Sequence, residues 1–147
     1  MAVSASPHGA CSAFDQDDCC AFSQSHEADL ALCNDLERLA DNLPLLPPAS
    51  DLRKLTERLE RASRRWDRRD EARLLEACDA ARLCRQLDSV HAEDVIEALW
   101  GEWRSRRGGN VERLAYMLRS LFDGRRRAIA IERLWLGCSS CHSSLRD

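Results

Sequence analysis

The sequence contains no long hydrophobic run, and a membrane-spanning helix needs roughly 18 or more apolar residues. Its first residues, MAVSASPHGACSAFDQDD, also contain neither the basic stretch nor the apolar stretch of an export signal. We therefore expect a cytoplasmic protein with no membrane partner. Because thiols stay reduced in the cytoplasm, the eight cysteines are expected to be free thiols, metal ligands or small core residues rather than disulfides.

Common catalytic patterns are also missing. The sequence has no glycine-rich phosphate loop, no serine nucleophile with a base at a recognisable spacing and no internal repeat, so we predict a protein that is not an enzyme. Lysine occurs once, at Lys54, among 22 basic residues. Arginines are frequent in 53–73 and 104–127, but the acidic residues between them are typical of solvated helix faces, which argues against nucleic acid as a partner.

The alternating pattern of β-strands is absent, and apolar residues instead recur at helical spacing in four segments separated by Pro and Gly. The four predicted helices cover residues 25–43, 50–84, 89–104 and 110–136. This pattern predicts an all-α protein, an antiparallel four-helix bundle over 25–136. The Cys-, Ser- and Asp-rich residues 1–24 are expected to form a flexible tail, and 137–147 a C-terminal tail.

Several polar residues fall on or beside the apolar faces of these helices. The candidates for a metal site are His26, Asp70, His91 and Glu132, one from each predicted helix. A bundle that binds metal in its core takes side chains from facing helices, which is this arrangement. Structural ion pairs are the alternative, because Arg125 lies on the same stripe as Glu132 and arginines neighbour Asp70.

The four helices resemble those of hemerythrin-like (HHE cation-binding) domains over about residues 25–136. The resemblance is carried by the segments SHEADLALCNDLERLADNLP, RWDRRDEARLL, VHAEDVIEALWGEW and LRSLFDGRRRAIAIERLWL. In that family five histidines and two carboxylates bind a pair of non-haem irons. The resemblance implies that His26, Asp70, His91 and Glu132 are the ligands that remain here.

Three positions depart from the family pattern, because Trp66, Leu87 and Ala128 stand where the family has histidine. Fewer ligands should bind iron more weakly, and an indole cannot ligate a metal. Two functions therefore follow from the resemblance. One is the sensing or handling of metal, oxygen or redox state, and the other is a regulatory scaffold that binds a protein partner.

The C-terminal sequence GCSSCHSS contains the C-x-x-C-H spacing of covalent haem attachment. The run CSSCHSSLR resembles the end of c-prime cytochromes, which are also four-helix bundles, although the missing export signal argues against haem. Zinc is a further alternative, with Cys138, Cys141 and His142 as ligands and Cys19 or Cys20 as a fourth. The same cysteines could cycle between thiol and disulfide, or both chain ends could be inert.

Overall fold

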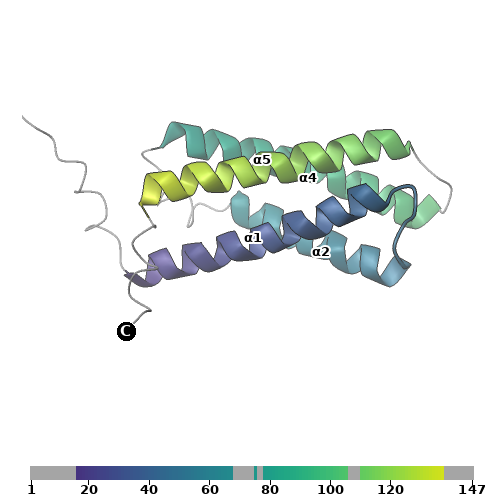
Figure 1. Cartoon of the computed structure of the whole chain (residues 1–147), viewed down its shortest axis with the longest axis horizontal. Helices are drawn as coiled ribbons and strands as arrows, with labels where there is room; N and C mark the ends of the chain where they lie inside the picture. The colour runs from purple at the N-terminus through teal and green to yellow at the C-terminus, as the bar shows by residue number, and fades with distance from the viewer. Residues whose placement is uncertain (1–15, 68–74, 76–77, 106–109, 138–147) are drawn as a thin grey trace, which may run out of the picture.

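The structure is a computed structural model that describes residues 16–67, 75, 78–105 and 110–137. Within these residues it contains no strand and four helices, which are α1 (Gln16–Asn42), α2 (Ala49–Trp66), α4 (Asp79–Ser105) and α5 (Val111–Leu136). Consecutive helices run in opposite directions, so that the beginning of α1 and the end of α5 lie at the same end of the molecule (Figure 1). The predicted all-α four-helix bundle is confirmed.

The ends of α5 agree with the sequence prediction. Asn110 caps the helix, and its side-chain oxygen accepts a hydrogen bond of 2.9 Å from the backbone N–H of Arg113. Gly137 ends the helix in the left-handed conformation, with φ of 60°, which a residue without Cβ adopts at little cost. Local chemistry therefore fixes both boundaries of this helix.

The start of α1 differs from the prediction. The helix begins at Gln16, so the expectation of a flexible tail over 1–24 is wrong for residues 16–24. The reason is Phe22, which is buried against Leu75, Ala81 and Leu136 at the end of the bundle. One apolar side chain in a polar segment gives no periodic signal, although it is enough to dock the first turns of α1. Residues 1–15 and 138–147 lie outside the described residues.

The break between the second and third predicted helices is also misplaced. The sequence pattern predicts one helix to residue 84 and another from residue 89, whereas α2 ends at Trp66 and α4 begins at Asp79. Within α4 the buried positions Ala81, Arg85 and Asp88 recur at helical spacing. Two of these three are charged, so the sequence pattern does not mark the buried face of the first part of α4 as apolar, and it does not indicate where the helix starts.

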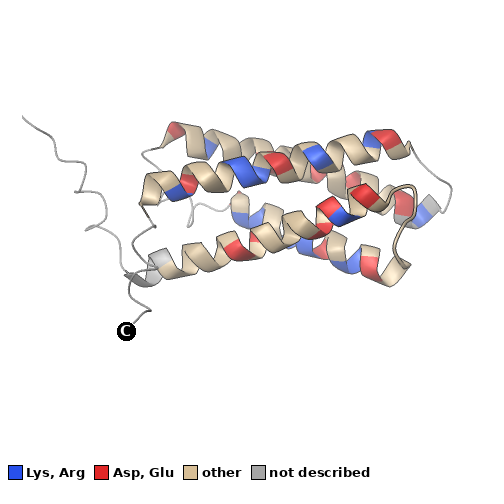
Figure 2. Cartoon of the chain, in the orientation of Figure 1, with Lys and Arg blue, Asp and Glu red and all other residues tan. Residues whose placement is uncertain are grey.

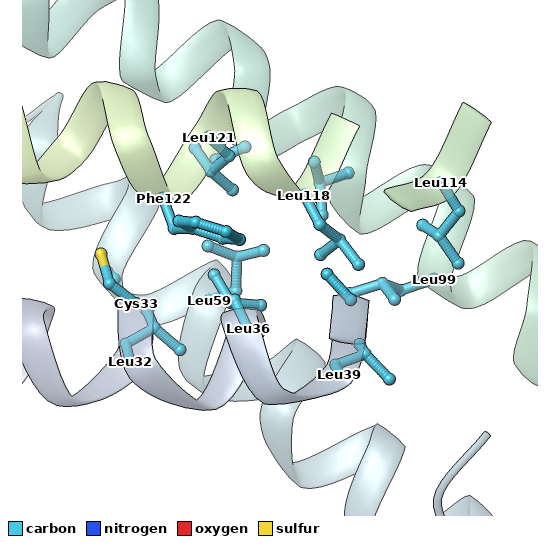
Figure 3. Packing of buried hydrophobic residues seen from close by; sticks show 14 of the residues in the cluster. Leu32, Cys33, Leu36, Leu39, Leu59, Leu99, Leu114, Leu118, Leu121 and Phe122 are labelled. Carbon is cyan, nitrogen blue, oxygen red and sulfur yellow. The ribbon is translucent and has the colours of Figure 1, made fainter. Parts of the chain in front are cut away.

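Buried apolar side chains form two clusters along the bundle. The larger fills the half near the α1–α2 connection, where leucines of facing helices point toward one another (Figure 3). Its labelled members are Leu32, Cys33, Leu36, Leu39, Leu59, Leu99, Leu114, Leu118, Leu121 and Phe122. The smaller cluster, formed around Phe22 and Leu136, lies at the opposite end. The remaining interior includes several buried charged side chains.

Charged side chains occur along all four helices (Figure 2). Some of them join neighbouring helices, as in the pairs Arg126–Glu37 at 2.7 Å and Arg133–Glu27 at 2.9 Å between α5 and α1. Such partly exposed pairs contribute little to stability, because water competes for both charges. None of the helices described is long and apolar enough to cross a membrane.

Candidate functional site

A buried polar network separates the two apolar clusters. Its fully interior members are His26 and Asp29 of α1, Arg85 and Asp88 of α4, and Arg125 and Glu132 of α5. None of the six is more than 4% exposed. On each helix the two residues are three or seven positions apart, a spacing that places both on one face. The second helix, α2, contributes Trp66 and the half-buried Arg65.

Glu132 lies at one centre of this network and has both carboxylate oxygens engaged. Its Oε1 accepts hydrogen bonds from Arg85 Nε at 2.7 Å and from Arg125 Nη1 at 3.3 Å. Its Oε2 lies 2.6 Å from His26 Nε2, and because an ionised carboxylate can only accept, the imidazole donates through this nitrogen. Three helices are thereby joined at a single side chain.

Asp29 forms the second centre, on the other side of Arg125. Arg125 donates to Asp29 Oδ2 through Nε at 3.1 Å and Nη2 at 3.0 Å. The same oxygen accepts from Trp66 Nε1 at 2.8 Å, while Arg65 Nη2 donates to Oδ1 at 2.7 Å. The guanidinium of Arg125 also lies over the Trp66 ring, 4.9 Å from its centroid, a cation–π contact. Arg125 therefore connects the two centres.

The charges in the network balance. Three carboxylates, those of Asp29, Asp88 and Glu132, face three guanidinium groups, those of Arg65, Arg85 and Arg125. Burial alone would raise the pKa of Glu132, but the His26 hydrogen bond and the two arginines outweigh burial and hold this pKa at about 2. Burial also disfavours the charge on Arg125, yet Glu132 and Asp29 raise its pKa. Both groups are thus charged in the interior.

Asp88 is the network member with a buried carboxylate oxygen that forms no hydrogen bond within the described residues. Its Oδ2 is 3.5 Å from Arg125 Nη1 and has no hydrogen-bond partner among the residues described. Its Oδ1 would stand 3.2 Å from a Cβ at position 124, so Gly124 allows α4 and α5 to approach here. Burial raises the pKa of Asp88 to about 6, and the opposing charge of Arg125 offsets this effect only in part.

We predict that Asp88→Asn reduces the loss of stability that accompanies a rise in pH from mildly acidic to neutral. The pKa of Asp88 rises from an ordinary 3.8 to about 6 on folding. The stability that protonation of Asp88 contributes is therefore fully present below pH 3.8 and is lost as the pH rises through 6. Between about pH 5 and pH 8, the free energy of unfolding should fall by about 1 kcal/mol more in the wild type than in the variant. Urea titrations at both pH values measure this, and equal pH slopes would contradict it.

The predicted metal ligands have different positions in the structure. His26 and Glu132 are in contact in the interior, whereas His91 is exposed on α4 and Asp70 lies outside the described residues. Across the described ranges, no group of three or more His, Cys, Asp or Glu side chains is placed to hold a metal ion. Of the four candidate ligands, the structure brings two together.

The network does not fit the iron centre that the resemblance implies. Both oxygens of Glu132 and the Nε2 of His26 already form hydrogen bonds, and the guanidinium groups of Arg85 and Arg125 stand beside them. A metal cation placed on Glu132 would face two fixed positive charges at short range. Trp66, at a position where the family has histidine, fills interior volume and donates to Asp29.

Three of the six interior members of the network, Asp29, Arg85 and Asp88, were not identified as a site in the sequence analysis. Asp29 falls on the leucine stripe of α1, three residues before Leu32 and seven before Leu36, so its position could have been found from the spacing. Arg85 and Asp88 were hidden because the predicted break between helices was placed across them. The placement of Glu132 and Arg125 on the buried stripe of α5 is confirmed, since neither is exposed.

Four cysteines of the described residues are free thiols, namely Cys20, Cys33, Cys78 and Cys84. Cys20 is exposed on α1, and Cys33 is a core residue whose pKa burial raises to about 12, so it remains protonated. Of the other predicted ligands at the chain ends, Cys19 lies on α1, and Cys138, Cys141 and His142 lie outside the described residues. Zinc, haem and thiol chemistry at these positions stay predictions.

Comparisons with protein-family models, curated proteins and solved structures found no match to this chain. The resemblance to hemerythrin-like domains therefore stays a prediction that rests on the sequence segments alone. The class of protein that the fold and site define is a four-helix bundle with an apolar core and a charge-balanced network of buried side chains.

Proposed function

We propose that this protein is a non-catalytic regulatory scaffold, a helical bundle that acts by binding a protein partner rather than by using a metal. The observation that carries the proposal is the set of contacts made by Glu132. Where a metal-binding bundle would present free ligands, this carboxylate accepts hydrogen bonds from Arg85 and Arg125 and contacts His26. Arginine supplies the positive charge that a metal would otherwise provide.

The resemblance to hemerythrin-like domains is compatible with this proposal. A family scaffold that has lost three histidines would leave its remaining carboxylates unpaired in the interior, which costs several kcal/mol. Arg125 and Arg85 satisfy those carboxylates. The scaffold can then persist without iron, and its surface is what remains available for function.

The metal content of the purified full chain tests this proposal. We expect a colourless protein with iron and zinc well below one atom per chain, because the buried carboxylates that could ligate a metal already accept hydrogen bonds from arginines. Elemental analysis and an absorption spectrum measure both properties. A pair of irons per chain with oxo-bridge absorption would restore the metal-handling function, and a Soret band would establish haem on the C-x-x-C-H sequence.

A further inference from the structure

The exposed hydrophobic side chains are concentrated on α4 and α5. Of the eight large hydrophobic residues that are exposed, six belong to these two helices, and Leu45 and Leu46 lie between α1 and α2. The six are Leu83, Leu87, Val90, Tyr116, Leu134 and Trp135. Within the described residues, α1 and α2 themselves expose none. Single exposed leucines are ordinary on a protein surface, whereas a contiguous row of exposed apolar side chains indicates an interaction site.

Three of these residues belong to one line along α4. Leu83, Leu87 and Val90 are separated by four and three positions, and the same line continues through Asp94 and Glu97. All five are exposed. We call this set the α4 stripe, and at 1.5 Å per residue it is about 21 Å long. Its first half is apolar and its second half is acidic.

A surface hollow of about 610 Å³ adjoins the acidic half of the α4 stripe. Six of the residues that line it are Asp94, Glu97 and Glu102 of α4 with Arg113, Tyr116 and Met117 of α5. Among the described residues of this lining, carboxylates outnumber guanidinium groups, and the carboxylates of Asp94 and Glu97 are exposed. Its volume is within the range of sites that accept ligand side chains.

A second hollow of about 490 Å³ lies on the other side of the molecule, beside Leu45. It carries charges of both signs, and Asp35 accepts hydrogen bonds there from Arg58 at 2.6 Å and Arg38 at 3.2 Å. The lining has two carboxylates, Asp35 and Asp51, and three basic side chains, Arg38, Lys54 and Arg58. The second hollow therefore has no excess of negative charge that would attract arginines. It serves as a matched control for the α4 stripe.

We propose that the α4 stripe and its hollow bind an amphipathic helix of a partner protein. The partner helix places leucine-like side chains on the apolar half, and its arginine or lysine side chains enter the acidic hollow. Complementary charge fixes the direction of the partner and excludes acidic helices. This inference rests on the proposed scaffold function, because it names the surface and the kind of partner through which the scaffold acts.

Binding of a synthetic peptide to the full chain tests this surface. The probe is a fluorescein-labelled amphipathic peptide with leucines along one face and arginines at one end of that face, and the control peptide has glutamates in place of the arginines. Fluorescence anisotropy should show saturable binding of the arginine peptide, weakened by salt, and far weaker binding of the control. Leu87→Glu and Glu97→Lys should each reduce affinity by about tenfold or more, whereas Leu45→Glu should change it by less than about twofold.

All three substitutions are at exposed positions, so circular dichroism should show unchanged folding. Absence of saturable binding, or equal binding by the wild type and Leu87→Glu, would overturn the assignment of the surface. A larger effect of Leu45→Glu would place the site at the second hollow instead. These outcomes concern the surface alone, because a metal-bound protein would refute the scaffold function whether or not the peptide binds.

Discussion

Arg125→Met should lower the free energy of unfolding by roughly 4 kcal/mol or more, the largest effect that we expect from a single substitution. Methionine fills much of the same volume but removes the cation that Asp29 and Glu132 share. Neither carboxylate can reach water in the folded protein, since both are at most 1% exposed. Urea unfolding followed by circular dichroism measures the loss.

Arg127→Met is the matched control for this substitution. Arg127 belongs to the same helix but is exposed, so the same chemical change should alter stability by less than about 0.5 kcal/mol. A comparable loss in both variants would mean that methionine disturbs α5 in general. A small loss in Arg125→Met would show that the buried carboxylates find other partners or take up protons.

Glu132→Gln should cost roughly 3 kcal/mol, because the amide keeps the shape of the side chain and removes the charge. Arg85 and Arg125 would then lose the anion that they share. The stabilising effect of Glu132 in the wild type should persist across neutral pH, because its pKa near 2 keeps it ionised there. This contribution disappears only as the pH falls from 4.5 toward 2.

A double-mutant cycle assigns the effect to a specific contact. Arg85 Nε is 2.7 Å from Glu132 Oε1, so Glu132→Gln and Arg85→Met should be coupled by about 2 kcal/mol. The double variant would then be more stable than the sum of the two losses predicts. Additive losses would show that Glu132 acts through Arg125 or His26 rather than through Arg85.

Much of the fold could be predicted from the sequence because its apolar stripes are regular. The leucines of α1 and α2 recur at three and four positions, and the end of α5 is marked by Gly137. Such local signals are sufficient for helix type and number. They fail where the buried face is polar, as in the first part of α4, and where one residue such as Phe22 docks a helix terminus.

The site could be predicted only in part, because helical spacing indicates that a charged residue is buried and does not indicate which residue it contacts. Glu132 and Arg125 could be placed on an interior face from spacing alone. Whether that carboxylate binds a metal or an arginine depends on Arg85, which comes from a helix whose start was misplaced. The contact between Trp66 and Asp29 depends likewise on how α1 and α2 face each other.

Thermal melting of the wild type and of Glu132→Gln, each with and without a metal chelator, separates an interior held by ion pairs from one held by metal. If arginines satisfy Glu132, the chelator should leave both melting temperatures unchanged, and the variant should melt lower in both conditions, since the unpaired cations remain. If a metal satisfies Glu132, the chelator should lower the melting temperature of the wild type to that of the variant, which would contradict the ion-pair network as the basis of the fold.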